Sequence, residues 1–286
     1  NSLIADNVVQ GQRNDITYYG AGIAAWRGGL EVVDSEIARN QFSWTGGKVL
    51  YGPGLYLDGG IHRIFNCLIY GQRRASSAPI YGVVTLGAGT VTVVNASVLN
   101  NACDAIRRSG GTALVRNSIL WGNIGDVSGV VGVEYCNVQD GTSNGVSGTI
   151  STNPAFERGI YLRADSPCVN AGNTNATDLG LSGKTTRADG TADTGLVDLG
   201  YHQTNGIAWT NADLYVTESG SDSASGTNVA EALRTVTKAV SRARHGTRIH
   251  IGAGVYGTAS GETFPLTLNR FGVQLLGAGP DQTVLN

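Results

Sequence analysis

The fold is decided by a repeated stretch, which reads VVNASVLNN at residues 93–101 and VRNSILWGN at residues 115–123. Gapless copies are VVDSEIARN (32–40), IFNCLIYGQ (64–72), the partial NSLIADN (1–7) and the weaker VEYCNVQDG (133–141). Equivalent positions are Ser2, Ser35, Cys67, Ala96, Ser118 and Cys136, at steps of 33, 32, 29, 22 and 18 residues. Two residues later each copy has one apolar residue: Ile4, Ile37, Ile69, Val98, Leu120 and Val138. One recurring apolar position predicts strands that stack in register around an internal aliphatic ladder.

Glycine turns complete each repeat. A second strand-like stretch follows each of the first four copies and ends at Gly28–Gly29, Gly59–Gly60, Gly87 with Gly89, and Gly110–Gly111. Two strands and a turn describe a coil, and no single coil could bury its apolar side alone. The sequence therefore predicts an all-β fold, a parallel β-helix, and crossover handedness favours the right-handed form.

Two polar rows accompany the apolar one. The first comes just before the Ser or Cys position: Asn1, Asp34, Asn66, Asn95 and Asn117. The second comes five residues after it: Asn7, Asn40, Gln72, Asn101 and Asn123. Side-chain amides at bends can satisfy turn backbone groups and the amide of the next coil, so we expect structural ladders rather than a binding site.

Residues 229–245 have the pattern of one short α-helix. Asn228 is a good N-cap with Glu231 three residues on, and Gly246 follows the pattern. The apolar stripe is Val229, Leu233, Val236, Val240 and Ala243. We expect this helix to cap the open end of the coils that follow it, with Arg234, Lys238 and Arg242 on a solvated face.

Composition excludes several classes of function. The 286 residues are 41% apolar, 42 are glycine, and the net charge of −2 gives no general attraction to nucleic acid. Apolar runs are far shorter than the roughly 20 residues that span a bilayer, so no membrane insertion is expected. The absence of Met suggests a processed product or a part of something longer.

Longer motifs resemble a known superfamily. The stretches ISTNPAFERGIYLRADSPCVNAG (150–172) and RADGTADTGLVDLGYH (187–202) are similar to the terminal motifs of large surface-associated proteins. Residues 214–257 resemble the opening strand, capping helix and first coil of the same group. The group is the secreted bacterial right-handed β-helix proteins of the pectate-lyase-like superfamily, which implies an extracellular, secreted or cell-surface location.

This resemblance implies an unusual order of parts. Residues 1–204 correspond to the later coils and closing segment of one β-helix, 205–212 to a linker, and 213–286 to the opening of the next. A β-helix that stops within a coil leaves an unpaired edge at each end of the chain. When two such edges are complementary but not related by a twofold axis, the subunits join head to tail and form open filaments. We therefore expect a structural repeat unit of an extracellular filament or long surface protein. It would propagate head to tail with itself, by continuation of the β-helix from Asn286 to Asn1, between subunits or in tandem.

The alternative is a β-helix that binds or cleaves a polysaccharide, as a lyase or hydrolase. The polygalacturonase-like and pectate-lyase signatures are absent, and only Asp58 and Asp104 suggest a carboxylate pair. No catalytic residue, no cofactor and no enzymatic activity are therefore expected. Four tryptophans could stack on a sugar or pack in the protein: Trp26, Trp44, Trp121 and Trp209.

The sequence also suggests a metal site and two disulfides. Asp189, Asp193 and Asp198 lie within ten residues of one another in a glycine-rich loop, which would suit a structural calcium ion. In a chain with surface-protein motifs, four cysteines suggest an oxidising compartment. Cys136 with Cys168, tying the last coil to the closing segment, is the first candidate disulfide, and Cys67 with Cys103 is the second.

Overall fold

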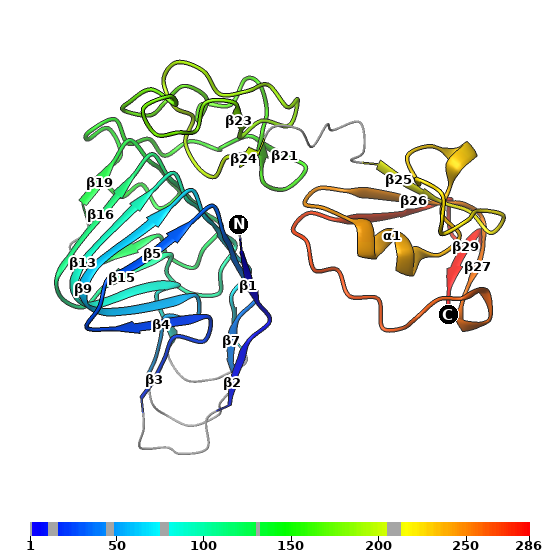
Figure 1. Cartoon of the computed structure of the whole chain (residues 1–286), viewed down its shortest axis with the longest axis horizontal. Helices are drawn as coiled ribbons and strands as arrows, with labels where there is room; N and C mark the ends of the chain where they lie inside the picture. Colours follow the sequence, from blue (N-terminus) through cyan, green and yellow to red (C-terminus); the bar gives the residue numbers. More distant parts are fainter. Residues whose placement is uncertain (1, 11–16, 44–48, 75–79, 130–131, 205–212) are drawn as a thin grey trace. The chain divides into compact units, whose positions relative to one another are not determined.

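The structure is a computed structural model of the whole chain (Figure 1). It describes all residues except 1, 11–16, 44–48, 75–79, 130–131 and 205–212. The chain forms two compact units. The first contains residues 1–154, 167–186 and 192–203, and the second contains residues 155–166, 187–191 and 204–286. The expected linker at 205–212 lies outside the described residues.

The repeated stretch forms a six-stranded parallel sheet in the first unit. Its order is β1 (Leu3–Ala5), β6 (Glu36–Ala38), β10 (Leu68–Tyr70), β14 (Ser97–Leu99), β17 (Ile119–Trp121) and β20 (Asn137–Val138). The predicted aliphatic ladder is confirmed residue by residue, because Ile4 pairs with Ile37, Ile37 with Ile69, and so on to Val138. Each step along this sheet is one coil.

A second parallel sheet carries the other strands of each coil. It contains β4 (Ile23–Trp26), β5 (Leu30–Val33), β9 (Leu55–Phe65), β13 (Val84–Val94), β15 (Ile106–Arg108), β16 (Thr112–Arg116), β18 (Val127–Ser128) and β19 (Gly132–Glu134). The glycine turns allow close stacking here: a Cβ on Gly89, which has φ +87°, would lie 2.3 Å from the Gly60 carbonyl oxygen.

Two short sheets complete the coils of the first unit. One is β2 (Val8–Gln10), β7 (Gln41–Ser43) and β11 (Arg73–Arg74). The other is β3 (Tyr18–Tyr19), β8 (Leu50–Tyr51) and β12 (Ile80–Tyr81). Both are parallel and follow the same coil order.

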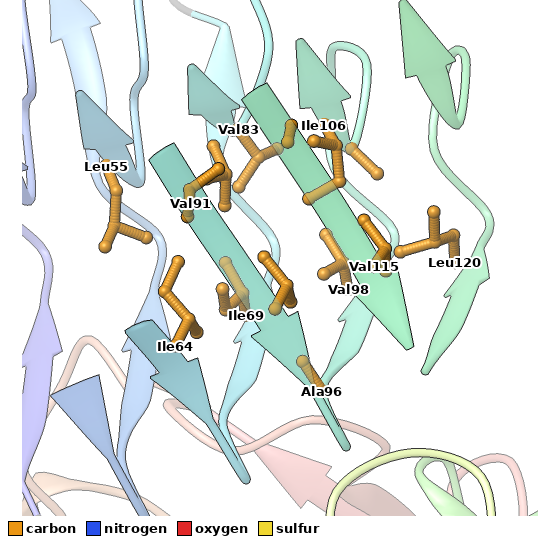
Figure 2. Close-up of a cluster of buried hydrophobic side chains, with 14 of the residues drawn as sticks. Leu55, Ile64, Ile69, Val83, Val91, Ala96, Val98, Ile106, Val115 and Leu120 are labelled. Atoms are coloured by element: carbon orange, nitrogen blue, oxygen red, sulfur yellow. The ribbon is translucent and has the colours of Figure 1, made fainter. Parts of the chain in front are cut away.

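The core of the first unit lies between the two large sheets. Figure 2 shows aliphatic side chains from both sheets meeting there, among them Leu55, Ile69, Val98 and Leu120. These four side chains are fully buried. Truncation of such a residue to Ala typically costs about 2–5 kcal/mol.

The second unit is a smaller parallel stack. Its sheets are β25 (Asp213–Val216), β26 (Arg248–Ile251) and β28 (Gln274–Gly277), and β27 (Gly254–Tyr256) with β29 (Thr283–Leu285). An antiparallel pair, β21 (Phe156–Glu157) with β22 (Tyr161–Leu162), also belongs to it. Leu214, Ile249 and Tyr256 form its core with residues of the helix.

The predicted helix over 229–245 is wrong in its bounds. The α-helix α1 spans Val236–Arg242, and Asn228 caps a separate 3₁₀ turn at Val229–Glu231. Leu233 between them forms a parallel bridge with Val216, which interrupts the helix. The apolar stripe fails at its first member, because Val229 is 65% exposed.

A cap from another part of the chain sets the start of α1. The Glu262 carboxylate accepts hydrogen bonds from the backbone N–H groups of Val236 (2.7 Å) and Thr237 (2.8 Å). Among the described residues, α1 is the one α-helix, which agrees with the all-β class. No helix in the described part of the chain is long and apolar enough to cross a membrane.

Candidate functional site

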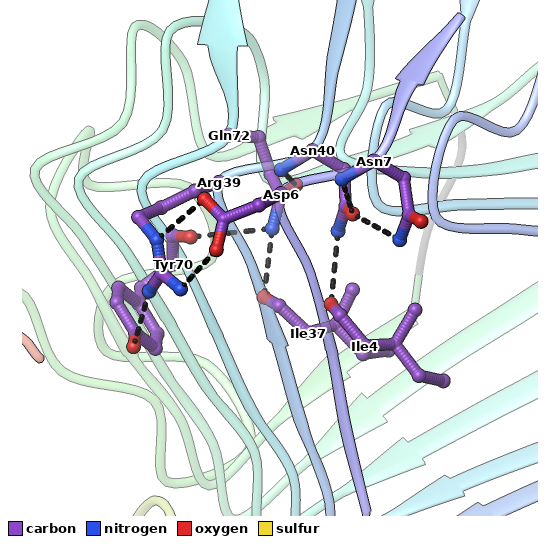
Figure 3. Close-up of polar contacts among 8 residues, drawn as sticks. All are labelled: Ile4, Asp6, Asn7, Ile37, Arg39, Asn40, Tyr70 and Gln72. Carbon is purple, nitrogen blue, oxygen red and sulfur yellow. Dashed lines mark hydrogen bonds and ion pairs between the residues drawn. The ribbon is translucent and has the colours of Figure 1, made fainter. Parts of the chain in front are cut away.

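The second polar row forms an amide ladder between coils (Figure 3). Its members are Asn7, Asn40, Gln72, Asn101 and Asn123. The side-chain oxygen of each member after Asn7 accepts the backbone N–H of the member before it, at 3.1, 2.9, 2.9 and 3.2 Å. The side-chain nitrogen donates to the carbonyl of the aliphatic-ladder residue in the preceding coil, for example Gln72 Nε2 to Ile37 O at 2.7 Å. Each amide therefore bridges two successive coils.

The first polar row occupies left-handed turns and is here called the turn row: Asp34, Asn66, Asn95 and Asn117. Their φ values are 50°, 49°, 50° and 49°, a conformation that Asn and Asp tolerate best among residues with a Cβ. Asn1, the expected first member, lies outside the described residues. The turn row binds the closing segment: Asn66 Nδ2 donates to His202 O (2.9 Å), and Asn95 Nδ2 to Asp198 O (3.1 Å).

A salt bridge beside the amide ladder was not expected from the sequence. Buried Arg39 binds both carboxylate oxygens of Asp6, at 2.9 and 2.6 Å, and donates to Tyr70 Oη at 3.0 Å (Figure 3). The hydrogen bond from Arg39 is the main cause that lowers the pKa of Asp6. Arg39 also has a left-handed backbone with φ 54°, so no propensity argument would have chosen Arg there.

The three carboxylates expected to bind calcium make other contacts. Asp189, in the second unit, pairs with Arg187. In the first unit, Asp193 Oδ2 lies 2.7 Å from His202 Nε2, and Asp198 accepts hydrogen bonds from Thr186 Oγ1 (2.5 Å) and Asn170 N (2.7 Å). Burial is the main cause that raises the pKa of Asp198. Within the described residues, no group of three or more His, Cys, Asp or Glu side chains is arranged to hold a metal ion.

Neither of the two disulfides expected from the sequence is formed within the described part of the chain. Cys67, Cys103, Cys136 and Cys168 are all buried. Cys67 and Cys136 occupy the same row as Ser35 and Ser118, and all four donate to the carbonyl two residues earlier. Cys168 Sγ accepts a hydrogen bond from Asn137 Nδ2 at 3.1 Å. Burial raises the pKa of Cys67 to about 11 and that of Cys136 to about 12, which makes both thiols unreactive.

An aromatic row was missed in the sequence. Tyr19, Tyr51 and Tyr81 pair in register, with ring centroids 5.6 Å apart at each step. The guanidinium of Arg107 lies 3.9 Å from the centroid of the Tyr81 ring, and Trp26 packs edge-on against Tyr19. The sequence contains a signal for this row, because a glycine follows each tyrosine: Gly20, Gly52 and Gly82. All three glycines have a positive φ in the structure.

The carboxylates and tryptophans considered for sugar binding or cleavage do not gather at one site. Asp58, Asp104 and Trp26 lie near the tyrosine row, and Trp121 lies in another sheet. Asp104 is 3.8 Å from Arg107 in a salt bridge. Burial, followed by the charge of Asp58, raises the pKa of Tyr56 to about 12. Trp121 is in β17, and Trp44 and Trp209 lie outside the described residues. The aromatic rings pack mainly on one another, which stabilises the stack of coils.

The edge strands nearest the two ends of the chain carry exposed apolar side chains. In the first unit, β1 and β2 have a described partner on one side only, and Leu3 and Val8 are 49% and 45% exposed. In the second unit, β28 and β29 are the edge strands, and Leu285 is 40% exposed. Leu285 pairs with the fully buried Tyr256, so it occupies an inward-facing position that no further coil covers. Such edges are templates for additional strands.

Comparison with known protein families gives a match in the second unit. Residues 218–281, which are 64 of the 286 residues, match the family described as "Protein of unknown function (DUF1565)". This family is associated with parallel β-helix proteins. The match covers α1 and strands β26 to β28, where the sequence resembles the opening of a β-helix. No curated protein and no solved structure matches the chain.

Proposed function

We propose that the protein is a structural repeat unit of an extracellular filament or long surface protein. Successive units join by continuing the β-helix from Asn286 of one to Asn1 of the next. The observation that supports the proposal is that Leu285 near the end of the chain and Ile4 near its start have the spacing of two inward residues of one coil, when Asn286 is followed by Asn1. The joint from Asn286 to Asn1 has the same geometry whether the units are separate chains or repeats of one polypeptide.

The phase of the coil supports this joint. In the first unit, the inward residue before the turn row and the aliphatic-ladder residue after it are always five positions apart, as in Val32 to Ile37 and Ile64 to Ile69. Leu285 has the inward position of Val32, because it pairs with buried Tyr256. Joining Asn286 to Asn1 of the next unit places Ile4 five positions after Leu285. An inserted or missing residue would turn one inward side chain outward.

The rows of the first unit support a structural role. Aliphatic, amide and tyrosine rows each repeat from coil to coil in register. All of them stabilise stacking along the axis, and each has an end member that a further coil could bind. An extracellular location agrees with the resemblance of the closing motifs to those of surface-associated proteins.

The test is electron microscopy of the chain at neutral pH across a range of concentrations. About ten coils at about 4.8 Å each predict filaments with an axial period on the order of 50 Å. Leu3→Lys, which places a charge on the open edge β1, should abolish filaments while the circular dichroism spectrum stays unchanged. Ile124→Lys is the matched control, because Ile124 is 69% exposed but lies away from both edges.

Discrete particles at every concentration would contradict the proposal. That result would favour the alternative, a β-helix that binds or cleaves a polysaccharide, and the next measurement would be binding of acidic polysaccharides. Filaments that persist unchanged in Leu3→Lys would show that assembly uses some surface other than the coil edge.

A further inference from the structure

The closing segment of the first unit lies along the turn row. This segment, here called the strap, consists of residues 167–186 and 192–203. Lys184 Nζ binds Asp34 Oδ1 at 2.7 Å. His202 exchanges two hydrogen bonds with the Asn66 side chain, at 2.7 and 2.9 Å, and the Asp198 carbonyl accepts from Asn95 at 3.1 Å. The strap thus uses one side chain in each of three successive coils.

The contacts continue into the last coils. Asn173 exchanges two hydrogen bonds with the Asn117 side chain, at 3.0 and 3.1 Å, and Gly200 N donates to Asn117 O at 2.8 Å. Cys168 Sγ accepts from Asn137, which is in β20. The strap is therefore anchored next to β6, β10, β14, β17 and β20, which are five consecutive strands of one sheet.

An apolar strip reinforces the polar contacts. The residues just before the turn row, Val33, Phe65 and Val94, pack against strap residues. These strap residues are Ala176, Leu179, Leu181 and Val197. Their burial gives the strap a hydrophobic contact with three coils.

The strap has its own buried polar centre. Asp193 Oδ2 lies 2.7 Å from His202 Nε2 and accepts the backbone N–H of Asp198 at 2.9 Å. Both side chains of the Asp193–His202 pair are almost fully buried, at 1% and 0% exposure. These contacts join strap residues to one another.

We propose that the strap is an axial clamp. It bridges successive coils along the axis of the stack and detaches from them before the coils separate. Its anchors act in parallel with the hydrogen bonds between the strands, so they oppose axial opening of the sheet. The inference rests on the first unit alone and does not require the filament.

The test is native-state hydrogen exchange of the full chain, read by mass spectrometry. In the unmodified protein, strap amides should exchange faster than amides of β10, β14 and β17, because they open without the coils. The variant Asn95→Gly with Asn117→Gly keeps the left-handed turns and removes three side-chain hydrogen bonds to the strap. It should accelerate strap exchange by about tenfold or more and accelerate the coil amides much less.

Asn100→Gly is the matched control, since Asn100 has the same conformation (φ 51°) and is exposed. It should leave strap exchange unchanged. A second readout is the rate of coil unfolding in denaturant, which should rise in the double variant relative to this control. Two results would overturn the clamp: strap exchange unaffected by the double variant, or strap and coil amides that exchange at one common rate in the unmodified protein.

Discussion

The amide ladder and the turn row contain the same residue types but use them differently. In the ladder, Gln72 and Asn101 bind the coils on either side, so the partners are other copies of the same repeat. In the turn row, Asn66 and Asn95 bind the strap, which lies more than 100 residues further along the chain, although Asn66 also donates to Asp34 of the preceding coil. Backbone conformation separates the two rows, because turn-row residues are themselves left-handed, whereas ladder residues follow a left-handed residue. An Asn that recurs in every coil therefore indicates a bend in the backbone but does not identify the hydrogen-bond partner of its side chain.

The largest expected effect comes from the middle of the ladder. Gln72→Ala removes the acceptor for Asn40 N–H (2.9 Å) and the donor to Ile37 O (2.7 Å) in a fully buried site. The buried Asn40 N–H left without its acceptor should lower the free energy of unfolding by about 2 kcal/mol, measured by urea denaturation. Gln72→Asn is the control and should cost less, because Asn fills this position in the coils on either side. An equal loss in both variants would mean that the amide bridge is unimportant.

A pair of substitutions distinguishes the two rows directly. At Asn95, Ala should cost about 1 kcal/mol more than Gly, because φ is 50° and a Cβ is disfavoured in that conformation. At Asn101, which is not left-handed, the order should reverse, with Gly the more costly by about 0.5–1 kcal/mol. The measurement is the unfolding free energy of the four variants. If the Ala variant were the less stable one at both sites, or the Gly variant at both, the proposed conformational difference between the two rows would be wrong.

The pH dependence of the turn row is a smaller effect. Burial raises the pKa of Asp34, but hydrogen bonds from Asn66 and Lys184 outweigh it, and the net pKa is lowered. A lowered carboxyl pKa stabilises the fold above the unfolded-state pKa near 3.8, and this stabilisation is lost as pH falls through the folded-state value. Asp34→Asn should therefore reduce stability at pH 7 by about 1 kcal/mol or less and flatten its decline between pH 5 and pH 3. An unchanged slope would show that Asp34 does not contribute.

The smallest effect is expected at the exposed end of the ladder. Asn7 donates to Asn40 Oδ1 from its backbone (3.1 Å) and side chain (2.8 Å) and is exposed, so Asn7→Ala should change the unfolding free energy by about 0.5 kcal/mol or less. If units join end to end, Asn7 becomes an interior member, and the same variant should weaken filament formation more than folding. Turbidity and electron microscopy, compared with urea denaturation, would separate the two effects. A large loss of stability in the isolated protein would contradict the gradient along the ladder.

The repeat alone was sufficient to predict the register of the coils. The alignment of Ser2 with Ser35, Cys67 and Ala96 placed Ile4, Ile37, Ile69 and Val98 opposite one another, and the structure pairs them so. Shifting one strand by a single residue would turn its apolar side chain outward. The register can therefore be predicted from the alternating apolar pattern. The tyrosine row could have been found in the same way, from Tyr-Gly pairs at 19–20, 51–52 and 81–82.

Contacts between segments far apart in the chain could not be predicted in this way. The helix near residues 229–245 is shortened because Leu233 pairs with Val216 and because Glu262 caps the backbone at Val236. Cys136 was paired with Cys168 on sequence grounds, but Cys136 belongs to the buried Ser and Cys row and Cys168 binds Asn137. The contact of Asp193, an expected calcium ligand, with His202 was likewise not indicated by the sequence.

The sequence by itself determined the parallel stacking, the inward row and the positions of the bends, because these depend on residues that recur at fixed places in every coil. Only the tertiary structure decided what the bends bind. The strap meets the turn row once, without any repeat in its own sequence, and its hydrogen bonds follow from the path of the chain rather than from residue type.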